Sequence, residues 1–461
     1  MYARVAGHVG EPHARELTER LLGFCDERLV RLGLPALREN ADRVARVGAD
    51  LDVGTADAGA CGGGPCGEAT AIAMAGMGDG YESLVCVVRH DGEVWCWGTD
   101  PLGDGIEHAA CPSAQACSPI PVRVVADGVP SGTHATLGPV ASLAGGEEAM
   151  CALMRDGGVR CWGEIGNGQL PIADAGEHHI ARRGVDATGV PLSGIDAIAS
   201  GHYAGFAHRG TSWLAWGEGH LGSLADAVDT THGAIVSAAL EGATAISAGW
   251  AFGCGLWPPN AVRCWGLNDH AQLGRMPFGV DPSDGSRRHD AVPAPVSLPG
   301  VPTTVSAALD SACVLIAGRA WCWGSDLRGA LGTFQTSSAM CTCEVMPAEV
   351  DLPASVLLVD LASSSVADRH CGRSTQGLVY CWGESSLGGA GSVANVIAPE
   401  TPVEIAAGVA LHADRLAVGA GTSCAIDPSG EVWCWGTNRG GALAMPPDTV
   451  AHPMATRVVF P

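Results

Sequence analysis

The chain has 461 residues and a formal net charge of −23 at pH 7, and every one of its 26 basic residues is arginine. The acidic balance argues against a nucleic-acid-binding protein, because phosphate binding needs a basic face that releases counterions. No apolar run approaches the ~18–20 residues of a membrane-spanning helix, and the length leaves room for one large domain and an extension.

Residues 1–50 differ in pattern from the rest of the chain. Apolar residues recur at helical spacing among mixed charges in ARELTERLLGFCDERLVRLGL, which predicts a short α-helical N-terminal extension. Residues 51–68 are rich in Gly, Ala and Asp and are predicted to be a linker. The first residues lack the apolar core of a signal peptide.

From residue 69 to residue 461 the chain repeats. A Trp-Gly pair recurs at intervals between 49 and 65 residues, and a period near 50 is typical of stacked-repeat folds. The seven anchors are Trp97, Trp162, Trp216, Trp265, Trp323, Trp382 and Trp435. Each copy is interpreted as four short strands: a Pro-led strand, an apolar strand that ends in a small-residue turn, and a two-stranded hairpin.

The ends of the repeat region complement each other. The first copy lacks a Pro-led strand, and a spare one lies at 452–460. We therefore predict an all-β fold, a seven-bladed β-propeller over 69–461 whose first blade is closed by the C-terminal strand, which leaves no free sheet edge at the seam. An open β-solenoid is the alternative.

Two cysteines flank the turn in CVVRHDGEVWCWG, residues 86–98. A three-residue loop at 90–92 places Cys86 directly opposite Cys96 as a non-hydrogen-bonded pair, close enough for a disulfide. The same count pairs Cys151 with Cys161, Cys254 with Cys264, Cys371 with Cys381 and Cys424 with Cys434, and a two-residue loop at 317–318 pairs Cys313 with Cys322. In one copy the two expected places hold Gly205 and Ala215. The alternative is that each cysteine is a small core residue.

The remaining cysteines lie outside the hairpins. Cys61 and Cys66, and Cys111 and Cys117, bracket short loops and are able to pair, whereas the pairing of Cys25, Cys341 and Cys343 stays open. Disulfides on this scale favour an oxidising compartment, so we expect an exported or cell-surface protein. A reduced, cytoplasmic protein is the alternative.

The Trp-Gly pair opens a longer motif in four copies: WGLNDHAQLG (265–274), WGSDLRGALG (323–332), WGTNRGGAL (435–443) and WGEIGNGQL (162–170). This motif resembles the repeat of the regulator of chromosome condensation family, over about 390 residues from residue 69 to the end. The resemblance implies a β-propeller. The best-known activity of that family is nucleotide exchange on a small GTPase, but one fold hosts many unrelated functions.

The long insertions all fall between Trp-Gly and the Pro-led strand, so they emerge on one side of the propeller. We predict that this face binds a protein partner, because variable loops on a rigid scaffold are common binding sites. The candidate partner-binding residues are Asp104, His178, His179, Arg182, Asn268, His270, Arg287, Arg288, Asp326, Arg328, Asn438 and Arg439.

No catalytic motif is present: GxSxG, HExxH and a Gly-rich phosphate loop are all lacking. The sequence therefore predicts no catalytic residue, no cofactor and no metal, and favours a monomeric, non-enzymatic protein-binding scaffold. The alternatives are a guanine-nucleotide exchange factor and a propeller enzyme that acts on polysaccharide or peptide.

Overall fold

The structure is a computed structural model that describes residues 68–77, 82–111, 115–127, 134–164, 168, 170–172, 178–226, 230–281, 283, 285–333, 342–385 and 387–461. The predicted helical extension (1–50) and residues 51–67 of the predicted linker lie outside the described residues. The three short 3₁₀ helices of the described part are η1 (His220–Gly222), η2 (Ala238–Leu240) and η3 (Leu327–Gly329). No helix in these ranges is long and apolar enough to cross a membrane.

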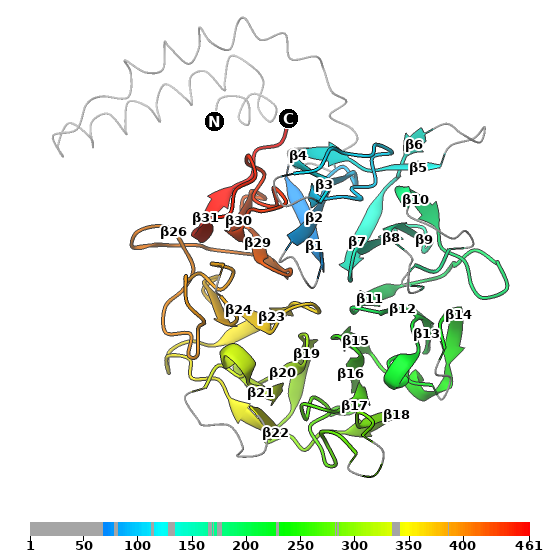
Figure 1. Cartoon of the computed structure of the whole chain (residues 1–461), viewed down its shortest axis with the longest axis vertical. Helices are drawn as coiled ribbons and strands as arrows, with labels where there is room; N and C mark the ends of the chain where they lie inside the picture. Colours follow the sequence, from blue (N-terminus) through cyan, green and yellow to red (C-terminus); the bar gives the residue numbers. More distant parts are fainter. Residues whose placement is uncertain are drawn as a thin grey trace, which may run out of the picture. The chain divides into compact units, whose positions relative to one another are not determined.

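Seven antiparallel sheets surround a central axis, as the sequence predicted (Figure 1). The innermost strands are β1 (Ala69–Met77), β7 (Val140–Gly145), β11 (Ala197–Ser200), β15 (Ala245–Ala248), β19 (Pro302–Ala307), β23 (Leu358–Ser363) and β28 (Arg415–Val418). The second strands are β2 (Glu82–Arg89), β8 (Ala149–Met154), β12 (Ala204–Arg209), β16 (Phe252–Trp257), β20 (Ser311–Ile316), β24 (Arg369–Ser374) and β29 (Thr422–Ile426).

The two outer strand positions contain the hairpin return and the Pro-led strand. The third strands are β3 (Val94–Thr99), β9 (Val159–Gly163), β13 (Ser212–Gly217), β17 (Ala261–Leu267), β21 (Arg319–Ser325), β25 (Val379–Gly383) and β30 (Val432–Thr437). The fourth strands are β4 (Cys117–Arg123), β10 (His178–Arg183), β14 (His232–Ser237), β18 (His289–Pro295), β22 (Cys343–Glu349) and β31 (Ala451–Arg457).

We number the blades 1 to 7 in chain order, from the blade that begins with β1 to the blade that begins with β28. Two blades depart from the four-strand arrangement. In blade 2 the ribbon of β5 (Val125–Asp127) and β6 (His134–Thr136) adds to the outer edge of β10. In blade 6 the sheet contains three strands, β23 to β25, and β26 (Glu404–Ala406) pairs with β27 (Val409–Ala410) in a separate ribbon.

The prediction that the C-terminal strand completes the first blade is wrong. β31 pairs with β30, and β4 completes blade 1, so blades 1 and 7 are each built from four consecutive strands. The Pro-led strand is the last strand of its own blade, because the long loop returns it to the hairpin that precedes it. Side chains close the ring instead: Met74 and Val85 of blade 1 pack with Cys424 of blade 7.

The anchor tryptophans pack between blades, and all seven are buried. Four of them also donate the indole Nε1–H to the long loop of the preceding blade. These bonds are Trp97 to the Ala442 carbonyl (2.8 Å), Trp265 to Ser223, Trp323 to Gln272 and Trp435 to Gly389 (2.9 Å each). Each of these four tryptophans therefore fixes the long loop of the preceding blade and also fills the core between the two blades.

All six hairpin disulfides are formed, with Cα–Cα distances of 4.0–4.2 Å that fit a non-hydrogen-bonded pair. Cys111 also pairs with Cys117, and Cys343 is disulfide-bonded. In the copy without cysteines, the prediction that Gly205 occupies the first cysteine position is wrong. Arg209 pairs with Ser212 around a two-residue loop, so Phe206 lies opposite Ala215 at the cysteine positions.

Candidate binding face

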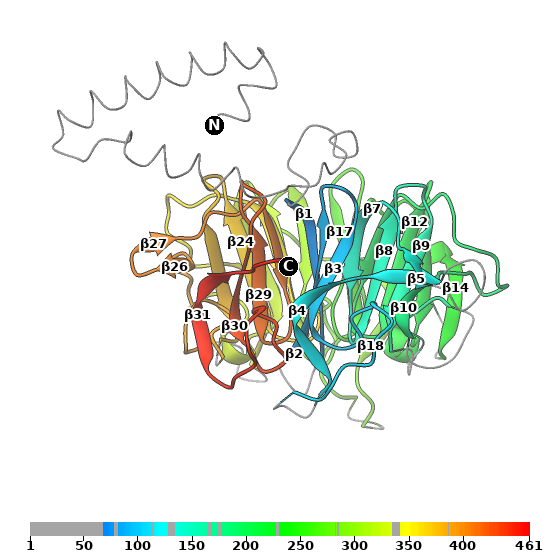
Figure 2. The ribbon, with the colours of Figure 1, turned by 90° about the horizontal axis from the view of Figure 1, so that it is seen from above.

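Two sets of connections emerge on the same side of the propeller. Successive strands of a blade run in opposite directions between two faces (Figure 2). The turns from the first to the second strand therefore share a face with the long loops from the third to the fourth strand. We call these turns the axial turns, because they join the innermost strands: 146–148, 201–203, 249–251, 308–310, 364–368 and 419–421. The long loops surround them.

Backbone hydrogen bonds join several axial turns to one another. The His202 N–H donates to the Gly249 carbonyl (3.0 Å), and the Trp250 N–H donates to the Leu309 carbonyl (3.0 Å). The Leu309 N–H continues the series to the Ala367 carbonyl (3.3 Å). The approach requires glycine at position 249, since a Cβ there would lie 2.1 Å from the Ala308 carbonyl oxygen. The small-residue turns of the sequence are therefore the places where the blades touch.

A cluster of ionisable side chains lies where the blade 4 loop meets these turns. We call Asp269, His270, Asp310 and Asp368 the axial cluster. His270 Nδ1 lies 3.0 Å from Asp269 Oδ1 and 3.7 Å from Asp310 Oδ2, and the Asp310 N–H donates to Asp368 Oδ1 at 3.3 Å. Gln272 Nε2 bridges Asp269 (3.0 Å) and Asp310 (3.3 Å). Two carboxyl groups, from blades 4 and 5, thus contact one imidazole, and the Asp368 carboxyl of blade 6 contacts the Asp310 backbone.

The carboxyl groups of the cluster have opposite electrostatic environments. Burial opposes ionisation of Asp269, but hydrogen bonds from His270, Gln272 and Arg287 outweigh it and lower its pKa to about 2. Burial raises the pKa of Asp310 to about 6, and burial together with the Asp310 charge raises the pKa of Asp368. The hydrogen bond to Asp269 raises the pKa of His270. The surroundings of Asp310 and Asp368, with His270 3.7 Å from Asp310, therefore do not fully offset the cost of burying two ionised carboxylates.

Aromatic side chains flank the cluster on the blade 3 and blade 4 turns. The Arg287 guanidinium lies over the Trp250 ring at 4.5 Å and donates from Nε to Asp269 Oδ2 at 2.6 Å. Trp250 in turn contacts Tyr203, with ring centroids 6.0 Å apart. His202 Nε2 lies 2.9 Å from Glu147 Oε2 on the next turn. The mouth of the axis therefore combines negative charge with an aromatic edge.

Among the described residues, Asp269, His270 and Asp310 form the one group whose ligand atoms lie close enough to share a metal ion, within 4.8 Å. However, Asp269 already binds Arg287 and Gln272. A protein cation thus occupies part of the coordination that an ion would need, and the arrangement is that of an ion-pair network.

The predicted face residues fall into three groups, of which the first carries surface charge. His270 and Arg287 belong to the axial cluster or contact it. Arg288 pairs with Asp281 of its own loop (2.7 Å), and Arg328 reaches Glu384 of the next blade (2.6 Å). Arg439 lies in the blade 7 loop, where its N–H contacts Thr437 Oγ1 (3.4 Å). These arginines mostly link loops rather than extend freely into solvent.

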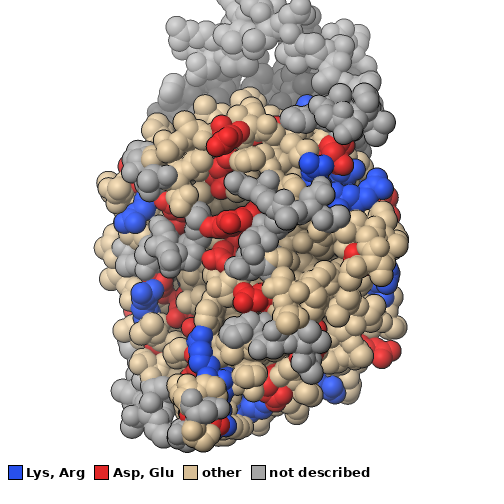
Figure 3. All heavy atoms as spheres, turned by 45° about the vertical axis from the view of Figure 1, so that its right-hand side comes forward, with Lys and Arg blue, Asp and Glu red and all other residues tan. Residues whose placement is uncertain are grey.

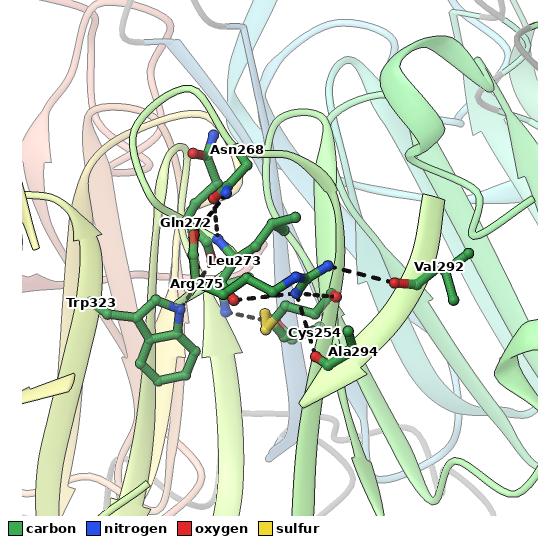
Figure 4. Close-up of a disulfide and its surroundings, with 11 residues drawn as sticks. Cys254, Asn268, Gln272, Leu273, Arg275, Val292, Ala294 and Trp323 are labelled. Carbon is green, nitrogen blue, oxygen red and sulfur yellow. Dashed lines mark hydrogen bonds between the residues drawn. A yellow bond between two sulfur atoms is a disulfide. The ribbon is translucent and has the colours of Figure 1, made fainter. Parts of the chain in front are cut away.

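The second group makes hydrogen bonds within its own loops, and two of its members, Asn268 and Asn438, are buried. Asn268 Nδ2 donates to the Arg275 and Pro277 carbonyls at 2.9 and 2.7 Å, and its Oδ1 accepts from the Leu273 N–H, so the side chain closes its own loop (Figure 4). Asn438 binds its loop in the same way. Asp326 Oδ1 accepts from the Leu331 N–H (3.2 Å). The fourth position of the Trp-Gly motif, which these three residues occupy, therefore fixes the start of the long loop.

The third group lies in the blade 1 loop and on the outer strand of blade 2, away from the axis. His178, His179 and Arg182 belong to strand β10 rather than to a loop, and His178 is buried. Asp104 binds His108 (3.1 Å) inside the blade 1 loop, and His179 lies 3.4 Å from Asp100. The structure therefore does not bring these residues together with His270 and Arg287.

Sequence reasoning missed the axial residues Asp310, Asp368, Trp250 and His202. They lie in short turns that the sequence marks only as small-residue breaks between strands. Strand alternation was the available signal, because it places these turns on the long-loop face.

Comparisons with known proteins support the fold. A profile of the family described as the regulator of chromosome condensation (RCC1) repeat matches residues 414–442. No curated protein sequence matches the chain.

Three solved structures of the same architecture are similar. Human WBSCR16 has a TM-score of 0.63 at 15% identity, covering 80% of this chain and 95% of that chain. Yeast RCC1 (Prp20) bound to Kap60 has a TM-score of 0.62 at 17% identity, covering 85% and 84%. Prp20p from Saccharomyces cerevisiae, described with its binding to Gsp1p and histones, has a TM-score of 0.60 at 17% identity, covering 85% and 86%. At these identities the likeness shows the fold, which is a propeller similar to that of RCC1.

Proposed function

We propose that the protein is a non-enzymatic scaffold that binds a protein partner with its long-loop face, around the axial cluster. The observation that carries this proposal is the cluster itself: two carboxyl groups with raised pKa lie at the point where loops and turns of blades 4, 5 and 6 converge. A lysine or arginine side chain of the partner would add a cation beside Asp310, next to His270, and Trp250 would cover its apolar stem.

The scaffold supports such a role because both of its faces are fixed. Disulfides hold the hairpins, and tryptophan bonds hold the loops of the preceding blades. Rigid presentation lowers the entropy that binding costs. On the side shown in Figure 3, arginine side chains are scattered among acidic ones. The similar yeast Prp20 also binds proteins, namely Kap60, Gsp1p and histones, although the likeness is one of fold.

We further propose that the protein works in an oxidising compartment. The seven disulfides between described cysteines would not persist against cytosolic reductants. Non-reducing peptide mapping of the native protein, made separately on medium and cell lysate, tests this. Linked 86–96 and 424–434 peptides in the medium would support the proposal, and free thiols in the lysate alone would overturn it.

The binding proposal is tested by cross-linking the full-length chain to its surroundings in the native source. Three baits are compared: the wild type, Asp310→Asn combined with Trp250→Ala, and Asp91→Asn combined with Asp156→Asn on the hairpin-turn face. The proposal expects one protein that is captured by the wild type and by the hairpin-face variant but lost with the axial variant. Equal capture by all three baits would contradict it.

A guanine-nucleotide exchange factor is the alternative, favoured by the likeness to Prp20. It predicts that the purified chain accelerates release of a fluorescent GDP analogue from a small GTPase. A propeller enzyme predicts turnover that is lost in Asp310→Asn. The scaffold expects neither activity.

A further inference from the structure

The outer edge of blade 6 differs from that of every other blade. In the other six, the third-strand residue at the cysteine position lies opposite a residue of the fourth strand. These partners are Val122, Arg182, Ile235, Ala294, Ala348 and Thr456. In blade 6 no described strand pairs with β25 at Cys381, and the sheet ends there.

The cause is one additional residue in the returning segment. In blades 1, 4, 5 and 7 the fourth strand pairs opposite the Trp-Gly glycine and again, four residues later, opposite the cysteine, as Ser118 and Val122 do in blade 1. In blade 6 Val396 bridges Gly383, and the Val403 N–H donates to the Val379 carbonyl as Val124 does to Val94. The counterpart of Val122 is therefore Thr401, five residues after Val396, and the segment bulges away from the strand.

This bulge leaves a slot against β25. Cys371 and Cys381 form a non-hydrogen-bonded pair, with Cα atoms 4.0 Å apart, so the Cys381 N–H and C=O point away from β24 and into the slot. Neither group has a partner among the described residues, although Cys381 is only 2% exposed. A cavity of about 390 Å³ lies over them, lined in part by Ala390, Val396, Ala398 and Thr401.

The slot has defined ends. Val396 and Gly383 exchange two hydrogen bonds (2.8 and 3.0 Å) at one end, and the Val403 N–H reaches the Val379 carbonyl (2.8 Å) at the other. The open stretch of β25 therefore offers one donor and one acceptor, the complement of a single residue in extended conformation. Buried backbone groups of this kind are rarely left unpaired in proteins.

We propose that the Cys381 slot binds a short extended peptide stretch of a protein partner, by strand addition to the edge of blade 6. One residue of the peptide exchanges its N–H and C=O with Cys381. Its side chain is small or β-branched, since Val122, Ala294, Ala348 and Thr456 fill this place in blades 1, 4, 5 and 7, the blades with the four-residue spacing. The site lies on the outer edge of a blade and uses none of the axial cluster, so it is independent of the binding face proposed above.

Amide hydrogen exchange tests the slot. The probe is the blocked peptide acetyl-Met-Ala-Thr-Arg-amide, which copies residues 454–457 of blade 7, where Thr456 lies opposite Cys434. In the free, full-length protein the Cys381 amide should exchange about tenfold faster than the Cys322 amide, which faces a complete strand. At millimolar concentration the peptide should slow Cys381 by about threefold and leave Cys322 unchanged. The same peptide with N-methylated threonine should have no effect.

Deletion of Glu400 restores the four-residue spacing of the other blades and provides an independent control. Thr401 should then take the slot, so that the Cys381 amide exchanges as slowly as Cys322 and ignores the peptide. The proposal would be overturned if the Cys381 and Cys322 amides of the wild type exchanged at the same rate. It would also be overturned if the Cys381 amide responded equally to both peptides or responded to neither. The wild-type measurement stands even if the deletion variant fails to fold.

Discussion

Aspartates at the two ends of the propeller have opposite surroundings. In a hairpin turn of blade 7, Asp427 accepts from the Ser429 and Glu431 N–H groups (2.8 and 3.0 Å) and from the Trp433 indole (3.0 Å). Burial works against it, but these bonds lower its pKa. Asp310 in an axial turn has the reverse balance, and burial raises its pKa to about 6. Hydrogen bonds within its own turn stabilise the Asp427 carboxylate, whereas burial in the axial turn disfavours the ionised form of Asp310.

The largest expected effect is on stability, and it concerns the Trp323–Gln272 contact that holds the axial cluster in place. Trp323 is fully buried and donates to the Gln272 carbonyl at 2.9 Å (Figure 4). The Gln272 side chain in turn binds Asp269 and Asp310. Trp323→Ala should lower the free energy of unfolding by about 3–5 kcal/mol. Trp250→Ala, a half-buried tryptophan at the mouth, should cost under about 1 kcal/mol. Denaturant unfolding measures both, and equal losses would break the distinction between structural and surface tryptophans.

Removal of one hairpin disulfide tests the opposite face. Replacing both Cys254 and Cys264 with alanine frees a loop of ten residues and should cost about 3 kcal/mol. The axial cluster lies at the other end of the blade, so capture of the partner should be unchanged below the unfolding temperature. Loss of capture in the folded variant would show that the two faces are coupled.

The pH dependence of stability separates Asp310 from Asp427 by sign. In the wild type, raising the pH from about 4 to about 6 ionises Asp310 in a site that disfavours the charge, so the free energy of unfolding falls. Asp310→Asn removes this fall and should be more stable than the wild type by about 2 kcal/mol above pH 6. Asp427→Asn should be less stable at neutral pH, and its deficit should vanish as the pH falls below the usual aspartate range. Unfolding curves from pH 3 to 8 measure both, and shifts of the same sign would refute the comparison.

The sequence predicted the blades well because their signals are local and repeated. Paired cysteines at fixed spacing, Trp-Gly anchors and turn residues each act within one hairpin, and all of them reappear in the structure. Two predictions failed for the same reason: the surroundings of a segment depend on residues that are distant from it in the sequence. The partner of β31 depends on where the long loop returns, and Asn268 looks like an exposed loop residue although its amide closes that loop. Asp310 and Asp368 are 58 residues apart and meet only because neighbouring blades place their axial turns side by side.

The smallest predicted effect is on affinity. If a cationic side chain of the partner lies beside Asp310, binding requires the ionised carboxylate, and affinity should weaken about tenfold from pH 7.5 to pH 5.0 as Asp310 takes up its proton. His270 becomes more positive over the same range and adds to the loss. Titration calorimetry with the captured partner measures the change. Asp310→Asn should bind more weakly than the wild type at pH 7.5 and should keep only the pH dependence that His270 causes, whereas Asp427→Asn should follow the wild-type profile. A profile unchanged by Asp310→Asn would place the cationic contact elsewhere on the face.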